Sequence, residues 1–238
     1  MAHTSGASRV ALVTAASRGI GAGCARVLAA RGYAVGLMAR SDAVHALADE
    51  LGEFGFTGDI ASADDLDAFA EAALTRYGRV DAVVVNTGHA AKGDLITIAD
   101  TDWHAALDLL VLPVVRLARR LAPLMAEQGG GAFVTISSFA ADAPALAFPL
   151  SAALRPALAT LAQLLTQRYG AQGVRFNNVL PGWVDSYAVT DEALRQIPLG
   201  RAATPEDVAR TVAFLVSDDA AYVSGQSWRV DGGFVRAR

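Results

Sequence analysis

The sequence predicts one α/β domain built on a parallel sheet. Short runs rich in β-branched residues alternate with helical patterns along the chain, which is typical of a parallel sheet covered by helices on both faces. A loop with two glycines follows the first of these runs and leads into a helical pattern. The length of 238 residues, 53% of them hydrophobic, allows one large core without disulfides.

The expected elements follow one another regularly. The first predicted helix, which follows the first strand, ends at Gly32. The last predicted helix has Thr204 as its N-cap and Pro205 in its first turn. The predicted strands cover 10–14, 34–39, 54–57, 81–86, 133–137, 174–180 and 226–230. The predicted helices cover 21–32, 42–51, 62–77, 100–127, 151–171 and 205–217.

Composition excludes several classes of protein. The single cysteine, Cys24, cannot form an internal disulfide, so a cytoplasmic protein is expected. The net charge of −4, without a basic cluster, argues against a nucleic-acid partner, and no apolar run reaches the roughly 20 residues of a membrane span. We see no metal-ligand spacing around the cysteine or the histidines. Residues 1–8 are predicted to be a disordered tail and residues 9–238 one domain.

The loop 14-TAASRGIG-21 is a candidate phosphate site. Gly19 and Gly21 permit a close approach of backbone, and the start of a helix offers free N–H groups and a favourable dipole to an anion. Ligands of such sheets bind at the carboxyl ends of the strands, where this loop falls. A tight turn without a ligand is the alternative interpretation.

The end of the second strand favours NADP(H) over NAD(H). Dinucleotide sites that bind the ribose diol carry an acidic residue there, whereas this strand ends in Ala39 and Arg40. An arginine binds a 2′-phosphate through a fork of donors, and Arg18 could add a second charge. The alternative is that both arginines are ordinary surface charges.

The chain resembles the short-chain dehydrogenase/reductase family from Arg9 to Phe234. TAASRGIG is similar to the family's TGxxxGxG loop, with Ala15 in place of the first glycine. VNTG (85–88) resembles NNAG, and FNNVLPGWVDS (176–186) resembles NxVxPGxVxT with Ser186 replacing the threonine. Gly58-Asp59 is similar to the pair whose aspartate meets the adenine, and 201–233 resembles the family's C-terminal segment.

The resemblance implies a Rossmann fold, a doubly wound parallel sheet of about seven strands. It also implies a homo-oligomer, a dimer or tetramer that pairs the helices near 100–127 and 151–171. The cofactor contacts that it implies for NADP(H) are Thr14, Ser17, Arg18, Gly19, Ile20, Arg40, Asp59, Asn86, Gly88, Arg155, Pro181, Gly182, Val184 and Ser186.

The family's catalytic residues are mostly replaced in this sequence. Its Ser–x12–Tyr–x3–Lys pattern, started at Ser138, puts Ser151 at the tyrosine position and Arg155 at the lysine position. The asparagine position, seven residues after Trp103, is Leu110. A serine hydroxyl is far less acidic than a tyrosine, and loss of a general acid costs about 10²–10⁴ in rate. Arg155 can still donate hydrogen bonds to a ribose hydroxyl, but it cannot shuttle a proton.

Two prolines are expected to disturb the helices of this site. Pro113 frees the carbonyl of Leu109 and should kink the long helix, unless it is simply tolerated. Pro156, next to Arg155, should make the catalytic helix begin there or bend.

Two side chains are candidates to replace the missing acid. His89 follows the loop expected to approach the nicotinamide, and histidine titrates near neutral pH, although a solvent-facing loop histidine is the alternative. Tyr187 is the second candidate, or else a residue of a lid. Ser138 and Ser151 could together hold a carbonyl oxygen. The expected substrate pocket contains His89, Phe148, Trp183 and Tyr187, and its mostly apolar loops favour a hydrophobic substrate over a sugar or a charged acid.

Three functions remain compatible with the sequence. The first is an NADP(H)-dependent oxidoreductase that acts on a small hydrophobic molecule with a non-standard proton donor. The second is a cyclase, isomerase or lyase on the same scaffold. The third is a catalytically inactive homologue, which senses nucleotide or forms a hetero-oligomer with an intact relative.

Overall fold

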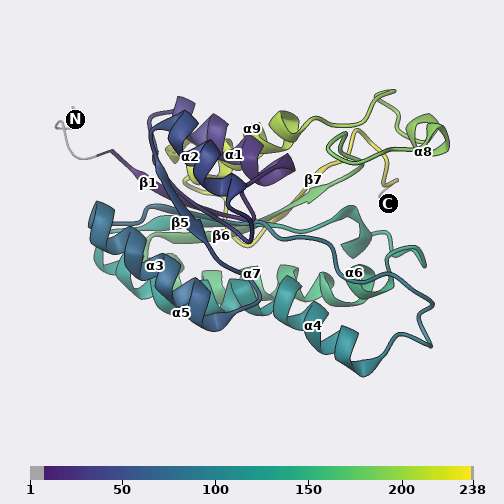
Figure 1. The fold of residues 1–238 in the computed structure, drawn as a ribbon, viewed down its shortest axis with the longest axis horizontal. Helices are drawn as coiled ribbons and strands as arrows, with labels where there is room; N and C mark the ends of the chain where they lie inside the picture. Colours follow the sequence, from purple (N-terminus) through teal and green to yellow (C-terminus); the bar gives the residue numbers. More distant parts are fainter. Residues whose placement is uncertain (1–7, 237–238) are drawn as a thin grey trace.

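Seven parallel strands form one sheet in the structure, a computed structural model that describes residues 8–236 (Figure 1). The strand order is β3-β2-β1-β4-β5-β6-β7, which confirms the predicted doubly wound sheet. Residues 1–7 of the predicted tail lie outside the described residues. The strands are β1 (Val10–Thr14), β2 (Ala34–Ala39), β3 (Phe54–Thr57), β4 (Ala82–Val85), β5 (Gly131–Ile136), β6 (Val174–Pro181) and β7 (Ser227–Val230).

Helices cover both faces of this sheet (Figure 1). α1, α2 and α9 pack on one face, and α3, α5 and α7 pack on the other. All residues of β1 and β4 are buried, because both faces of these central strands are covered. The helices are α1 (Gly19–Ala30), α2 (Ala43–Leu51), α3 (Ala63–Tyr77), α4 (Asp100–Leu110), α5 (Leu112–Glu127), α6 (Pro149–Leu154), α7 (Pro156–Tyr169), α8 (Asp191–Arg195) and α9 (Pro205–Val216). Along residues 8–236, no helix has both the length and the apolar character to cross a membrane.

The order in which successive strands are added to the sheet reverses between β1 and β4. Hydrogen bonds join the ends of these two strands. The Thr14 hydroxyl donates to the Asn86 carbonyl at 2.7 Å and accepts the Asn86 N–H at 3.0 Å. The Asn86 side-chain amide donates to the Ala15 carbonyl at 3.2 Å. The two loops that follow these strands are therefore held against each other at the point where ligands of this fold bind.

Two expected helices are each divided in two. The prediction of one helix over 100–127 is wrong, since α4 and α5 meet at Val111, whose φ is −115° and ψ −52°. The predicted helix 151–171 is likewise divided into α6 and α7, which meet at Arg155. Pro113 and Pro156 stand at the second and first positions of the new helices, where the missing N–H of proline costs least. Both predicted effects of these prolines are confirmed. The short helix α8 was not among the expected elements.

The turn after β1 is the tightest point of the fold. Ala15 has a φ of +47°, in the left-handed region that costs a non-glycine residue about 1–2 kcal/mol. A Cβ on Gly21 would lie 2.3 Å from the Ala15 carbonyl oxygen and 2.8 Å from the Asn86 amide nitrogen. Gly21 is thus required by close packing of α1 on the β1 and β4 ends.

Replacement of Gly21 by alanine should therefore destabilise the protein. We expect Gly21→Ala to lower the free energy of unfolding by about 1–3 kcal/mol, the usual range for overpacking. Gly170→Ala is the matched control, because a Cβ there meets only the Thr166 methyl at 3.7 Å. Urea unfolding followed by circular dichroism measures both changes, and equal stability of the two variants would contradict the role of Gly21.

Candidate active site

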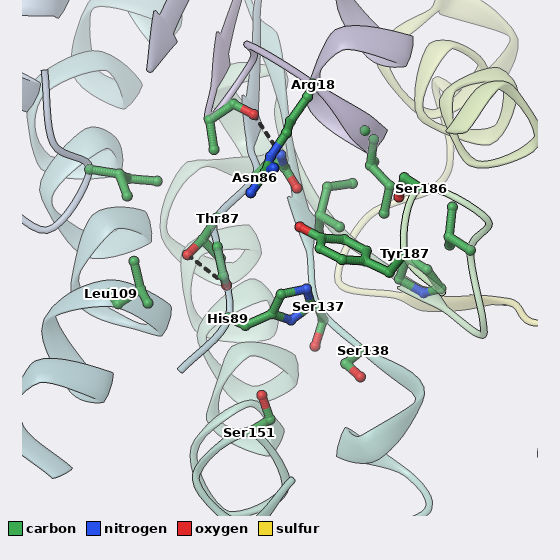
Figure 2. Close-up of a pocket in the computed structure, with 18 of the residues that line it drawn as sticks. Arg18, Asn86, Thr87, His89, Leu109, Ser137, Ser138, Ser151, Ser186 and Tyr187 are labelled. Carbon is green, nitrogen blue, oxygen red and sulfur yellow. Dashed lines mark hydrogen bonds between the residues drawn. The ribbon is translucent and has the colours of Figure 1, made fainter. Parts of the chain in front are cut away.

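A cavity of about 820 Å³ opens at the carboxyl ends of the central strands. Its walls come from the loops that follow the first six strands, β1 to β6, and from α4 and α6 (Figure 2). This is the place where the sequence predicted a nucleotide and a substrate to meet. The volume falls in the range of about 300–1,000 Å³ that is usual for small-molecule sites.

The cavity brings together most of the predicted site residues. All four candidate catalytic residues and all four expected substrate-pocket residues line it. Two expected cofactor residues do not. Thr14 is fully buried in its bonds to Asn86, and the Asp59 carboxylate accepts the Ala61 N–H at 3.0 Å, while Gly58 and Ile60 on either side reach the cavity. The cavity-lining residues that were predicted are Ser17, Arg18, Gly19, Ile20, Arg40, Asn86, Gly88, His89, Ser138, Phe148, Ser151, Arg155, Pro181, Gly182, Trp183, Val184, Ser186 and Tyr187.

One end of the cavity fits a dinucleotide. No side chain caps the first turn of α1, whose N-cap is Arg18, so the N–H groups of that turn are open to a ligand. Gly19 has a φ of +56°, and a Cβ there would lie 3.3 Å from the Ser186 hydroxyl. Arg18 and Arg40 are exposed, and neither forms an ion pair with a carboxylate in the described part of the chain. Two free guanidiniums beside an uncapped helix suit phosphate groups.

Arg155 is buried at the back of the cavity. It is 5% exposed; its Nη1 donates to the Ile136 carbonyl at 2.8 Å and its Nε to the Ser151 hydroxyl at 3.4 Å. Burial lowers the pKa of Arg155 to about 10, so the side chain stays charged at neutral pH. No carboxylate within residues 8–236 forms an ion pair with it.

Three serine hydroxyls lie on the same side of the cavity (Figure 2). The Ser138 oxygen accepts the Ala140 N–H at 3.1 Å and so begins the 3-10 turn of Phe139–Ala141. Ser151 contacts Arg155, as described above. The Ser137 hydroxyl is buried and has no hydrogen-bond partner in the described part of the protein. The hydroxyl hydrogen of Ser138 thus remains available to an acceptor on a ligand, whereas the Ser137 hydroxyl is too buried to be reached.

His89 and Tyr187 meet across the mouth of the cavity. Their rings form an edge-to-face contact with centroids 4.6 Å apart, although they come from the loops after β4 and β6 (Figure 2). Burial lowers the pKa of His89 below its ordinary value, and the positive charges of Arg155, Lys92 and Arg18 lower it further. The free protein therefore holds His89 mostly as neutral imidazole at pH 7.

An aromatic cluster forms the wall opposite the nucleotide end. Phe148 lies 6.1 Å from Phe139 and 6.0 Å from Trp183, measured between ring centroids. The ammonium group of Lys92 lies 5.1 Å from the centroid of the Phe148 ring. The indole nitrogen of Trp183 is buried, and no acceptor is found for it among the described residues.

The structure shifts one assignment on α4. Leu109 lines the cavity, whereas Leu110 packs away from it with Ala106, Val111 and Leu150. A hydrophobic side chain of α4 thus faces the cavity, but it is that of Leu109 and not that of Leu110.

Sequence reasoning missed several residues of the cavity wall. Ser137 and Phe139 flank Ser138, and a strand end followed by a turn is a signal that could have included them. Lys92 had a clearer signal, since it is the only lysine in the chain and follows His89 by three positions. In the described part of the chain, no group of three or more His, Cys, Asp or Glu residues is placed to hold a metal ion.

The chain is similar to known proteins over most of its length. The family model described as enoyl-(acyl carrier protein) reductase matches residues 14–235. The chain is 30% identical over 235 residues to the 3-oxoacyl-(acyl-carrier-protein) reductase of Escherichia coli, covering 94% of this chain and 96% of the relative.

Two solved structures are similar over nearly the whole chain. The L-sorbose reductase of Gluconobacter frateurii, complexed with NADPH and L-sorbose, superposes with a TM-score of 0.88 at 28% identity, covering 98% of each chain. A 7α-hydroxysteroid dehydrogenase complexed with NADH and 7-oxo glycochenodeoxycholic acid superposes with a TM-score of 0.89 at 30% identity, covering 97% of this chain and 96% of the other.

The charges around His89 lead to a direct test. We expect NMR titration of the free protein to give a His89 pKa below about 6.5, the value of an unperturbed histidine. Lys92→Gln should raise that pKa, because it removes one of the positive charges that disfavour the imidazolium. Arg210→Gln removes an exposed charge on α9 and should leave the pKa unchanged. A His89 pKa above the ordinary value would contradict the arrangement described here.

Proposed function

The chain belongs to the short-chain dehydrogenase/reductase family, and from this premise we propose that it is an NADP(H)-dependent oxidoreductase with a non-standard proton donor. Its proposed substrate is a small, hydrophobic molecule. The observation that carries the proposal is the cavity itself. One end of it has an uncapped helix start and two arginines without an ion-pair partner among the described residues, and at the other end Ser151 and Arg155 replace the family's tyrosine and lysine.

In this proposal, the nucleotide is held by residues from four loops. The first turn of α1 and Arg18 bind the pyrophosphate, and Arg40 binds the 2′-phosphate. Arg155 donates to the hydroxyls of the nicotinamide ribose, since it is a donor only and holds no carboxylate. Asn86, Gly88, Val184 and Ser186 border the nicotinamide. The bound nicotinamide supplies or accepts a hydride, which is the redox chemistry of the reaction.

His89 is the proposed proton donor. It lies at the cavity mouth against Tyr187, where it can reach both substrate and solvent. For reduction it must carry a proton, and its lowered pKa means that the charged fraction rises as the pH falls below the ordinary histidine value. The hydroxyls of Ser138 and Ser151 orient the oxygen of the substrate carbonyl.

The substrate itself is not determined by the relatives. One solved structure holds a sugar and another holds a steroid acid, although both have the same fold as this chain. The aromatic cluster around Phe148 supports a substrate with an apolar body.

A non-redox enzyme on the same scaffold is the second candidate. The serine at position 151 in place of the family's tyrosine favours it. A reaction without hydride transfer from the cofactor forms no substrate alkoxide, so it needs no tyrosine to protonate one. Such an enzyme would convert its substrate while bound NADPH stays unconsumed.

The expected homo-oligomer also stays a prediction, supported by the exposed Leu107 on α4 and Leu164 on α7.

Nucleotide binding is the first test of the proposal. Calorimetry should show that NADPH binds more tightly than NADH, because only NADPH carries the 2′-phosphate that meets Arg40. Arg40→Gln should weaken NADPH binding by about tenfold or more, as expected for loss of a charged hydrogen bond, and leave NADH binding unchanged. Arg210→Gln is the control for removal of a charge elsewhere. If no dinucleotide binds, the oxidoreductase proposal fails and a nucleotide-independent role replaces it.

The proton donor can be tested after a substrate has been found. NADPH oxidation is the assay for both steps. His89→Gln should lower kcat by about 10²–10⁴ and abolish the rise in rate at acid pH, because glutamine cannot carry the proton. Tyr187→Phe should keep the pH profile. Full loss of activity in Tyr187→Phe, with a normal profile in His89→Gln, would assign the proton to the tyrosine instead.

A further inference from the structure

The cavity has a charge of one sign. Four cationic side chains line it, Arg18, Arg40, Lys92 and Arg155, and no aspartate or glutamate of residues 8–236 does. The chain as a whole carries a net charge of −4, so this distribution is local to the cavity. A cleft lined by charges of one sign focuses its field on ligands of the opposite sign.

The nucleotide accounts for three of these charges if the proposed function holds. Arg18 and Arg40 stand beside the uncapped start of α1, and Arg155 lies at the position expected to meet the ribose. Lys92 belongs to the opposite wall, because its ammonium group lies over the ring of Phe148. One positive charge is therefore left for the substrate.

Lys92 is free to bind an anion. Its partner in the described residues is the face of Phe148, and no carboxylate forms an ion pair with it there. The nearest acidic residue in the loop, Asp94, accepts the Ile96 N–H at 3.0 Å. The chain contains 20 lysine and arginine residues, and Lys92 is the only lysine among them. A lysine acts as a mobile point charge, whereas arginine is the residue that forks onto phosphate.

The surroundings of Lys92 define the rest of the ligand. Phe148 and Trp183 offer aromatic surface, which suits an apolar ring or chain. A phosphate is less suited to this wall, because it requires several charged donors at once.

We propose that the substrate is an apolar monocarboxylic acid, whose carboxylate pairs with Lys92 and whose body packs against Phe148 and Trp183. The inference rests on the proposed function for the assignment of the three arginines to the nucleotide. It amends the expectation of an uncharged hydrophobic substrate. That expectation was based on the apolar composition of the loops 141–149 and 183–189 and left out the loop that carries Lys92. The apolar body remains as expected, and the carboxylate is added to it.

The test compares a small carboxylate with its neutral isostere. Benzoate and benzamide have the same shape and differ in charge, so calorimetric titration of each into the NADPH-saturated protein isolates the effect of the anion. We expect benzoate to bind at least about tenfold more tightly than benzamide, the worth of one charged hydrogen bond. Lys92→Gln should abolish this preference, Lys92→Arg should retain most of it, and Arg210→Gln should not change it.

The single lysine provides a second measurement that does not need a variant. An amine-reactive acylating reagent can modify only Lys92 and the α-amino group of the chain. Benzoate should slow the acylation of Lys92, measured by peptide mass spectrometry, while the α-amino group reacts at an unchanged rate and benzamide protects neither. This result is independent of any folding defect in the variants.

The outcomes separate this inference from the proposed function. Equal binding of benzoate and benzamide, a preference that survives in Lys92→Gln, or no binding of either at millimolar concentration would overturn the carboxylate site. Tight binding of inorganic phosphate in place of benzoate would also overturn it. If NADPH fails to bind, the proposed function falls, and protection of Lys92 by benzoate without nucleotide still decides whether the carboxylate site exists.

Discussion

The hydrogen bonds between Thr14 and Asn86 are the constraint on which the site depends. They join the ends of β1 and β4 at the point where the strand order reverses, so that the loops following these strands are held against each other beside the cavity. The Asn86 amide also holds the Ala15 carbonyl, which presses against Gly21 at the start of α1. The strained turn at Ala15 is therefore supported from both strands, and this support holds the first turn of α1 in place.

Two prolines shape the opposite end of the cavity. Pro113 and Pro156 divide helices that the pattern alone would join, and each break lies next to a residue of the wall. Near the first break, Leu109 lines the cavity and Leu110 packs in the cluster beneath it. Arg155 stands at the second break, between α6 and α7, from which its guanidinium reaches the Ile136 carbonyl.

Electrostatics connects the two ends of the cavity. Arg155 is buried without a carboxylate in the described part of the chain, and the charges of Arg18, Lys92 and Arg155 together disfavour a proton on His89. An anionic ligand relieves this repulsion, because it adds negative charge where the cations converge. In the proposed complex, we therefore expect binding of the nucleotide and protonation of His89 to be coupled, and a carboxylate beside Lys92 would strengthen the same coupling. The cavity is best understood as one charged unit, whose lining residues come from the loops after the first six strands.

The sequence by itself determined the fold and the nucleotide end of the site. Alternating patterns located all seven strands, and the loop TAASRGIG with Arg40 indicated the residues proposed to bind phosphate, most of which line the cavity, because these signals are local in the chain. Spacing from Ser138 also identified Ser151 and Arg155 as the replaced positions, both of which line the cavity. Only the tertiary structure decided that Thr14 joins the ends of β1 and β4 and does not line the cavity, that Leu109 faces the cavity, and that Lys92 lies over Phe148. These features arise from contacts between segments tens of residues apart, and no pattern along the chain records which of two distant side chains will meet.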